Sequence, residues 1–96
     1  MQEKNWQVYL IKCLDGSYYT GITNNLEKRI WEHKSGFIKN SFSSRYKLYK
    51  LIWFEEFYTP NEAIEVEKKV KDYRREKKLI LIKQINPYLK DLLSPC

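Results

Sequence analysis

The chain has 96 residues, of which 43% are hydrophobic and 16% aromatic. A chain of this length fits one domain with its own core, so we expect a single domain over residues 1–96. Lys and Arg number 18 against 12 Asp and Glu, which gives a net charge of +6. This excess favours binding to polyanions, most often nucleic acid, but does not establish it alone.

Composition also argues against membrane-spanning and zinc-binding proteins. No stretch approaches the roughly 20 apolar residues of a membrane span, and the N-terminal segment MQEKNWQ lacks the apolar run of a signal peptide. The two cysteines, Cys13 and Cys96, form no CxxC pair and are too few for a zinc site. We expect a cytoplasmic protein with reduced thiols, no disulfide partner and no membrane partner.

The first elements along the chain are two predicted strands. Residues 6–13 and 18–22 are rich in β-branched and aromatic side chains, which favour strands. Asp15 and Gly16 lie between them and are typical of a tight hairpin turn. The chain should therefore open with a β-hairpin.

A helix is predicted directly after the hairpin. Asn24 and Glu27 have the spacing of a capping box, and Gly36 is suited to end the helix. The following residues, 37–47, mix Ser, Lys, Arg and aromatic side chains without periodicity. They predict a basic loop that either contacts a nucleic-acid backbone or is simply solvated.

A third strand and two more helices are predicted in the second half. Leu48–Phe57 has the length and apolar content of a strand. Thr59, Pro60 and Glu62 are typical of a helix start, with Thr as N-cap and Pro at the first helical position. That helix should run to about residue 73, and a shorter amphipathic segment follows.

The order of these elements, β-β-α-β-α-α, predicts an α+β fold. A hairpin at the start favours an antiparallel sheet, and helices bury their apolar faces against such a sheet. We therefore expect a small three-stranded antiparallel sheet flanked by helices.

One carboxylate lies in an unusual place on the helix that follows Thr59. Advancing about 100° per residue from Ala63 places Val66 and Val70 in an apolar stripe and Glu67 inside it. Burying an unpaired carboxylate costs several kcal/mol, so Glu67 should have a cationic partner. That partner is a metal ion, Arg or Lys. The favoured alternative is an ordinary ion pair with Lys71 one turn later, or a carboxylate at the edge of the stripe that reaches water.

Two basic or titratable side chains border the buried face of the helix that follows the hairpin. With Leu26 and Ile30 on that face, Arg29 and His33 lie at its edges. A guanidinium offers a permanent charge and a fork of donors suited to phosphate oxygens. The alternatives are an Arg that covers the rim of the core with its methylenes and a structural His.

Five ordered segments resemble the GIY-YIG nuclease family. Gln7-Val8-Tyr9 and Tyr19-Thr20-Gly21 stand where the family has its two signatures, and residues 25–33 are similar to its next helix. Residues 62–71 resemble its metal-binding helix, and Asn86 matches an asparagine near the end of the domain. The resemblance is most specific to the small stand-alone YhbQ-type proteins, through the patterns DGSYYTGIT, LEKR and INPYLKDL.

The resemblance implies metal-assisted hydrolysis of phosphodiester bonds in nucleic acid, with DNA favoured over RNA although the sequence does not decide between them, and with DNA repair or recombination as its context. The small size of the domain favours recognition of structure or backbone over recognition of sequence. Glu67 would hold one Mg²⁺ or Mn²⁺ ion. The implied catalytic residues are Tyr9, Tyr19, Arg29, Glu67 and Asn86. Contacts to nucleic acid are expected from Arg29, His33, Lys39, Arg45, Lys47 and Lys71.

Three positions depart from the family pattern. Gln7 replaces Gly in the first signature, and Thr20 replaces Ile in the second. Ile22 stands where the excision-repair members carry a Lys, so any help from that Lys in activating the nucleophile is absent here.

The hairpin sets a condition on a site that both tyrosines share. With a two-residue turn at Asp15 and Gly16, Tyr19 would pair with Lys12 and face away from Tyr9. A shared site therefore requires a loop of odd length or a bulge.

Two other functions remain open. The first is a nucleic-acid-binding module of the same fold without catalysis, and the second is a structural or protein-interaction domain. Metal-dependent cleavage separates the nuclease from both.

Overall fold

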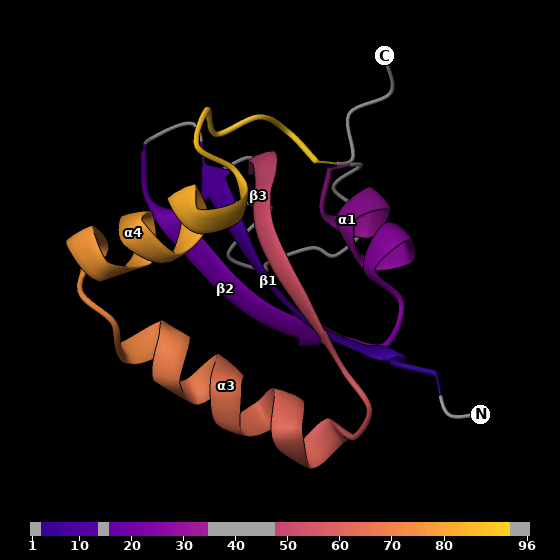
Figure 1. Ribbon diagram of the computed structural model, residues 1–96. Coiled ribbons are helices and arrows are strands. Elements are labelled where there is room, and N and C mark those ends of the chain that lie inside the picture. The colour runs from indigo at the N-terminus through magenta and orange to yellow at the C-terminus, as the bar shows by residue number, and fades with distance from the viewer. Residues whose placement is uncertain (1–2, 14–15, 35–47, 93–96) are drawn as a thin grey trace.

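The computed structural model describes residues 3–13, 16–34 and 48–92. The elements are β1 (Trp6–Cys13), β2 (Tyr18–Thr23), α1 (Leu26–Lys34), β3 (Leu48–Phe57), α3 (Pro60–Asp72) and α4 (Arg75–Ile85). The strands are antiparallel in the order β2-β1-β3, so β1 is central (Figure 1). The predicted order and the α+β class are confirmed. The expected basic loop at 37–47 lies outside the described residues.

The helices cover both faces of the sheet. α1 lies on one side, and α3 and α4 lie on the other (Figure 1). Alternate side chains of β1 point to opposite faces, so Val8 and Leu10 pack toward α3 and α4, whereas Tyr9 and Ile11 pack with Ile30 of α1. A central strand buried on both faces explains the continuous apolar run in its sequence.

Within the three described ranges, no helix has the length and apolar character needed to cross a bilayer.

The hairpin loop has odd length. Cys13 N–H donates to Ser17 O at 2.8 Å, so three residues lie between the paired ends of the strands. Gly16 has φ of +88°, a left-handed value that glycine adopts without strain and that three-residue hairpin loops use. Ile11 consequently pairs with Tyr19. A two-residue turn is therefore wrong, and the condition for a shared tyrosine site is met.

The two predicted helix starts differ in outcome. α1 is capped by Asn25, whose Oδ1 accepts from Lys28 N–H at 3.2 Å, so the predicted cap at Asn24 is wrong by one residue. The cap of α3 is confirmed, since Thr59 Oγ1 accepts from Glu62 N–H at 3.2 Å and donates to Glu62 Oε1 at 3.0 Å. The short Asn side chain caps equally well at either position, so neighbouring asparagines leave the sequence ambiguous.

A β-bulge interrupts the pairing of β1 with β3. Leu10 pairs with Trp53, whereas the next residue, Ile11, pairs with Leu51. Ile52 is therefore an extra residue on β3, and it joins Trp53 in the core beneath α3 and α4.

The chain after α4 binds to β3 at this bulge. Asn86 is only 5% exposed, and its Nδ2 donates to Ile52 O at 3.0 Å and to Lys90 O at 2.8 Å. Its Oδ1 accepts from Lys90 N–H at 3.0 Å, and Leu92 N–H donates to Leu51 O at 2.8 Å. Asn86 thus satisfies a carbonyl at the bulge and fastens the C-terminal segment to β3.

We predict that Asn86→Ala lowers the free energy of unfolding by about 1–3 kcal/mol, because it leaves buried backbone groups without partners. Urea denaturation measures this change. Gln84→Ala, an exposed polar residue on α4, is the control and should change stability by less than about 0.5 kcal/mol. Equal stability of the two variants would contradict the structural role of Asn86.

Candidate functional site

Tyr9 and Tyr19 lie on the same face of the sheet. Their ring centroids are 6.3 Å apart, with an angle of 40° between the ring planes. Tyr9 is 1% exposed, whereas Tyr19 is half-buried. Of the two phenols, Tyr19 is therefore the one with the greater access to solvent and to a bound substrate.

The ring of Tyr9 lies across Gly21. The two residues face each other on β1 and β2, and a Cβ atom at Gly21 would overlap with Cζ, Oη and Cε1 of Tyr9. Glycine is required here because the ring occupies the space of any side chain. The last residue of the second signature therefore fixes the position of the tyrosine in the first.

The environment of Tyr9 keeps its phenol neutral. Burial raises the pKa of Tyr9 far above the ordinary value of 10.0, the neighbouring Tyr19 raises it further, and the positive charge of Arg29 lowers it. A phenol with so high a pKa is protonated at neutral pH, so Tyr9 can donate a hydrogen bond but cannot act as a base.

Arg29 lies at the edge of the buried face of α1, as predicted, and its side chain is half-buried. It lines a polar pocket of about 230 Å³. The other lining residues are Thr23, Asn24, Asn25, Lys28 and Glu32. The cations of Lys28 and Arg29 outnumber the single carboxylate of Glu32, so with the amide and hydroxyl groups the pocket is suited to bind a phosphate.

Glu67 is held by Lys71. The Lys71 Nζ to Glu67 Oε1 distance is 3.4 Å, and the Glu67 side chain is 15% exposed. The favoured alternative from the sequence, an ion pair one turn apart, is therefore present. Ala63 and Val70 of α3 bury their side chains against the sheet, on the face opposite Tyr9. The sheet thus lies between α3 and the tyrosine pair.

The described residues offer few ligands for a metal ion. Within residues 3–13, 16–34 and 48–92, no group of three or more His, Cys, Asp or Glu side chains could hold one. Glu67 supplies a single partly buried carboxylate. One carboxylate fits Mg²⁺ or Mn²⁺ when water and substrate phosphate oxygens complete the coordination, because Mg²⁺ usually keeps several waters.

The remaining predicted site residues either bind elsewhere in the fold or lie outside the described residues. The amide of Asn86 bonds to the backbone of β3 and of the C-terminal segment. His33 belongs to the last turn of α1, but its side chain lies outside the described part. Lys39, Arg45 and Lys47 also lie outside it.

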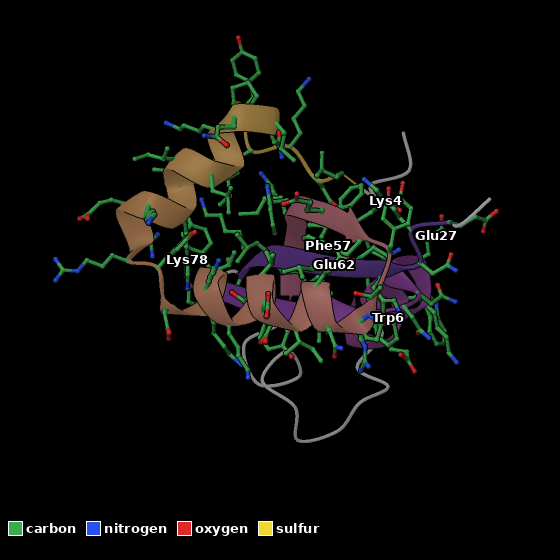
Figure 2. The ribbon with its side chains drawn as sticks, turned by 60° about the horizontal axis from the view of Figure 1, so that its bottom comes forward. Lys4, Trp6, Glu27, Phe57, Glu62 and Lys78 are labelled. Carbon is green, nitrogen blue, oxygen red and sulfur yellow. The ribbon has the colours of Figure 1, made fainter. Side chains whose placement is uncertain are left out.

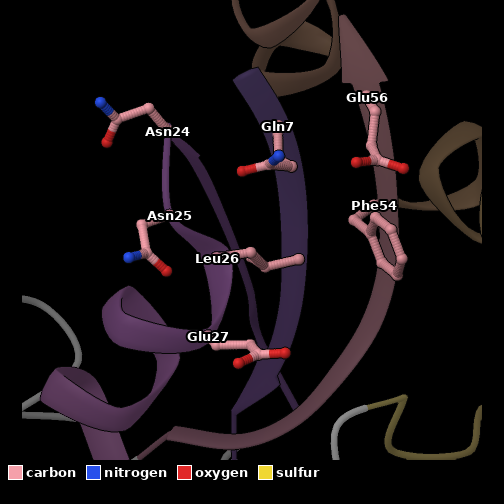
Figure 3. A pocket seen from close by; sticks show the side chains of 7 residues that line it. All are labelled: Gln7, Asn24, Asn25, Leu26, Glu27, Phe54 and Glu56. Carbon is pink, nitrogen blue, oxygen red and sulfur yellow. The ribbon is translucent and has the colours of Figure 1, made fainter. Parts of the chain in front are cut away.

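A pocket that the sequence did not indicate lies between the start of α1 and the sheet. Its volume is about 380 Å³. Two lining residues come from the turn before α1, two from its first turn, and three from β1 and β3 (Figure 3). They are Gln7, Asn24, Asn25, Leu26, Glu27, Phe54 and Glu56. The only signal in the sequence was Gln7, a polar residue two positions before Tyr9 on the same strand face.

A basic segment was also missed, although its charge is readable in the sequence. Residues 68–78 hold seven Lys or Arg and two Asp or Glu, a net charge of +5 out of +6 for the chain. Arg75 lies over the ring of Tyr18 at 4.9 Å, and Lys77 lies over that of Tyr73 at 4.2 Å. Lys78 lies toward one end of α3, and Trp6 lies toward the other (Figure 2).

Comparison with known proteins gives consistent similarities. The family model for the GIY-YIG catalytic domain matches residues 5–80. UPF0213 protein CPE1444 of Clostridium perfringens is 45% identical over 75 residues, which cover 78% of this chain and 80% of that protein. UPF0213 protein SSP2268 of Staphylococcus saprophyticus is 38% identical over 77 residues, which cover 80% of this chain and 93% of that protein.

A solved structure has the same fold. The solution NMR structure of UPF0213 protein BH0048 from Bacillus halodurans matches with a TM-score of 0.58 and 31% sequence identity. The match covers 94% of this chain and 98% of the other.

We predict that Gly21→Ala destabilises the protein by about 1–3 kcal/mol, because the added methyl group displaces the Tyr9 ring. In a Tyr9→Ala background the same substitution should cost far less, since the clash is gone. A double-mutant cycle from thermal or urea unfolding measures the coupling. Additive effects of the two substitutions would contradict the contact.

Proposed function

This chain belongs to the GIY-YIG catalytic domain family, among the UPF0213 proteins, and from that membership we propose that it is a metal-dependent DNA endonuclease. The family implies nuclease-type activity on nucleic acid, generally with a divalent metal ion. We infer in addition that this nuclease selects DNA by structure and acts in repair or recombination. The observation that carries the proposal is the placement of Tyr9, Tyr19 and Arg29 on one face.

In this mechanism Arg29 binds the phosphate and neutralises the charge that develops on its oxygens during attack. Lys28 lines the same pocket and adds a second positive charge. Tyr9, neutral and fixed over Gly21, can donate a hydrogen bond within the site, and its ring lies 6.3 Å from that of Tyr19. Tyr19, with its greater exposure, orients the attacking water.

Glu67 would hold the divalent ion once the carboxylate is released from Lys71. When bound, such an ion polarises the phosphate and stabilises the leaving oxygen. α3 contacts β2, which is an edge strand of the sheet. We propose that the substrate lies at this edge, where groups from both faces of the sheet can reach one phosphate.

We infer selectivity for DNA structure because so small a domain has little surface with which to read a base sequence. The basic segment 68–78 supplies sequence-independent contacts to phosphates, and Lys71 belongs to it. Asn86 takes part indirectly in this proposal, since it holds β3 and the C-terminal segment in position.

A second candidate function is a nucleic-acid-binding module without catalysis. It is favoured by the Glu67–Lys71 ion pair and by the position of α3 across the sheet from Tyr9. Such a module would use Arg29 and the basic segment for binding and would need no metal.

We predict that the protein cleaves branched, nicked or single-stranded DNA only when Mg²⁺ or Mn²⁺ is present. Arg29→Ala, Tyr19→Phe and Glu67→Ala should each lower the rate about a hundredfold or more, because each removes a group that acts on the reacting phosphate. Glu65→Ala, an exposed carboxylate on the same helix, is the control and should keep the wild-type rate. Metal-independent binding of DNA without cleavage would support the module instead.

We predict that charge in the basic segment sets much of the salt dependence of DNA binding. Replacing Arg74, Lys77 and Lys78 together with Gln should reduce the slope of log K against log salt by up to about 3, because fewer counterions are released. A matched triple replacement of Lys4, Lys83 and Lys90 keeps the same net charge. Equal slopes for the two triple variants would contradict binding of DNA at the basic segment.

A further inference from the structure

The pocket in Figure 3 adjoins the Arg29 pocket on the Tyr9 face of the sheet. Asn24 and Asn25 line both pockets. The volume of the pocket in Figure 3, about 380 Å³, falls within the range of about 300–1,000 Å³ that is usual for small-molecule sites. A ligand with a phosphate at Arg29 can therefore place its next chemical group in this second pocket.

Among the polar groups that line this pocket, hydrogen-bond acceptors outnumber donors. Gln7 Oε1 is buried and has no hydrogen-bond partner among the described residues. An ionised carboxylate only accepts, and Glu27 and Glu56 both line the pocket. A buried acceptor without a partner costs stability, so a ligand that donates N–H groups to Gln7 removes that cost. The same carboxylates repel a second phosphate.

The apolar part of the lining suits a flat ring. Phe54 and Leu26 contribute apolar side chains, and both are half-buried (Figure 3). Unpaired nucleobases are commonly recognised by stacking on aromatic rings together with hydrogen bonds to their edges. The combination of an aromatic ring, unfilled acceptors and an adjoining cationic pocket matches one nucleotide.

We propose that this pocket binds one unpaired nucleobase with an exocyclic amino group, as in cytosine, while the adjoining phosphate lies at Lys28 and Arg29. The amino group donates to Gln7 Oε1 and to the Glu56 carboxylate, and the ring lies against Phe54. The inference rests on the proposed function and narrows its substrate to DNA with an unpaired nucleotide. A paired base cannot enter, because its edge is occupied and its ring is stacked.

The test is fluorescence anisotropy of the full chain with three duplexes that differ only in a single-nucleotide bulge. The bulge holds cytosine, thymine or an abasic residue, and metal is omitted to prevent cleavage. Cytosine should bind about tenfold more tightly than the abasic bulge, because base stacking and hydrogen bonds are both gained. The affinity for the thymine bulge should lie between the other two affinities, because thymine lacks the amino group but still stacks.

Substitutions of residues that line the pocket test whether the preference for cytosine over thymine arises there. Gln7→Met and Glu56→Met should remove the advantage of cytosine over thymine, since a Met side chain has no oxygen acceptor. Glu56 is exposed, so its substitution preserves folding even if the Gln7 substitution does not. Glu55→Met, at an exposed neighbouring carboxylate that does not line the pocket, is the matched control and should keep the preference. Arg29→Ala should lower the affinity of the protein for all three duplexes by a similar factor.

The outcomes separate this inference from the function on which it rests. Equal affinity for the three bulges, with binding still weakened by Arg29→Ala, overturns the nucleobase pocket and leaves the proposed function standing. Competition by an arginine amide but not by cytidine monophosphate also overturns it, since the pocket then takes a protein cation. Absence of binding to every duplex, together with absence of cleavage when Mg²⁺ is added, overturns both proposals.

Discussion

The register of the β1–β2 hairpin is the constraint on which the site depends. Side chains alternate between the faces of a strand, so a loop one residue shorter would turn Tyr19 away from Tyr9. The three-residue loop with left-handed Gly16 sets Ile11 opposite Tyr19 and Gly21 opposite Tyr9. The absence of a side chain at Gly21 then lets the Tyr9 ring lie across β2.

The same alternation divides the chemistry of the domain. Tyr9 belongs to the α1 side of the sheet, with Arg29 close enough to affect its pKa, whereas Glu67 belongs to the helix on the other side. The proposed catalysis therefore needs a substrate at β2, an edge strand among the described residues, and a Glu67 carboxylate released from Lys71. Binding alone requires neither condition, so the nuclease and the binding module differ in where the substrate lies and in whether Glu67 is released.

Much of this fold could be predicted from local patterns, because Thr59, Pro60 and Glu62 act within one turn and strand composition acts within one strand. The cap of α1 was misplaced because Asn24 and Asn25 compete for the same role. The contacts of Asn86 could not be predicted, since they depend on a bulge at Ile52, 34 residues away. Helical spacing placed Glu67 at a half-buried position, but it could not choose between Lys71 and a metal ion.

The central claim is that groups from both faces of the sheet act on one phosphate. Paramagnetic broadening of NMR signals by Mn²⁺, measured with a non-cleavable DNA bound, tests it most directly. The account predicts that the signals of Glu67 and Tyr19 broaden together and that Glu67→Gln abolishes both effects. Broadening of the Glu67 signal alone, with that of Tyr19 unchanged in the DNA complex, would contradict a single site.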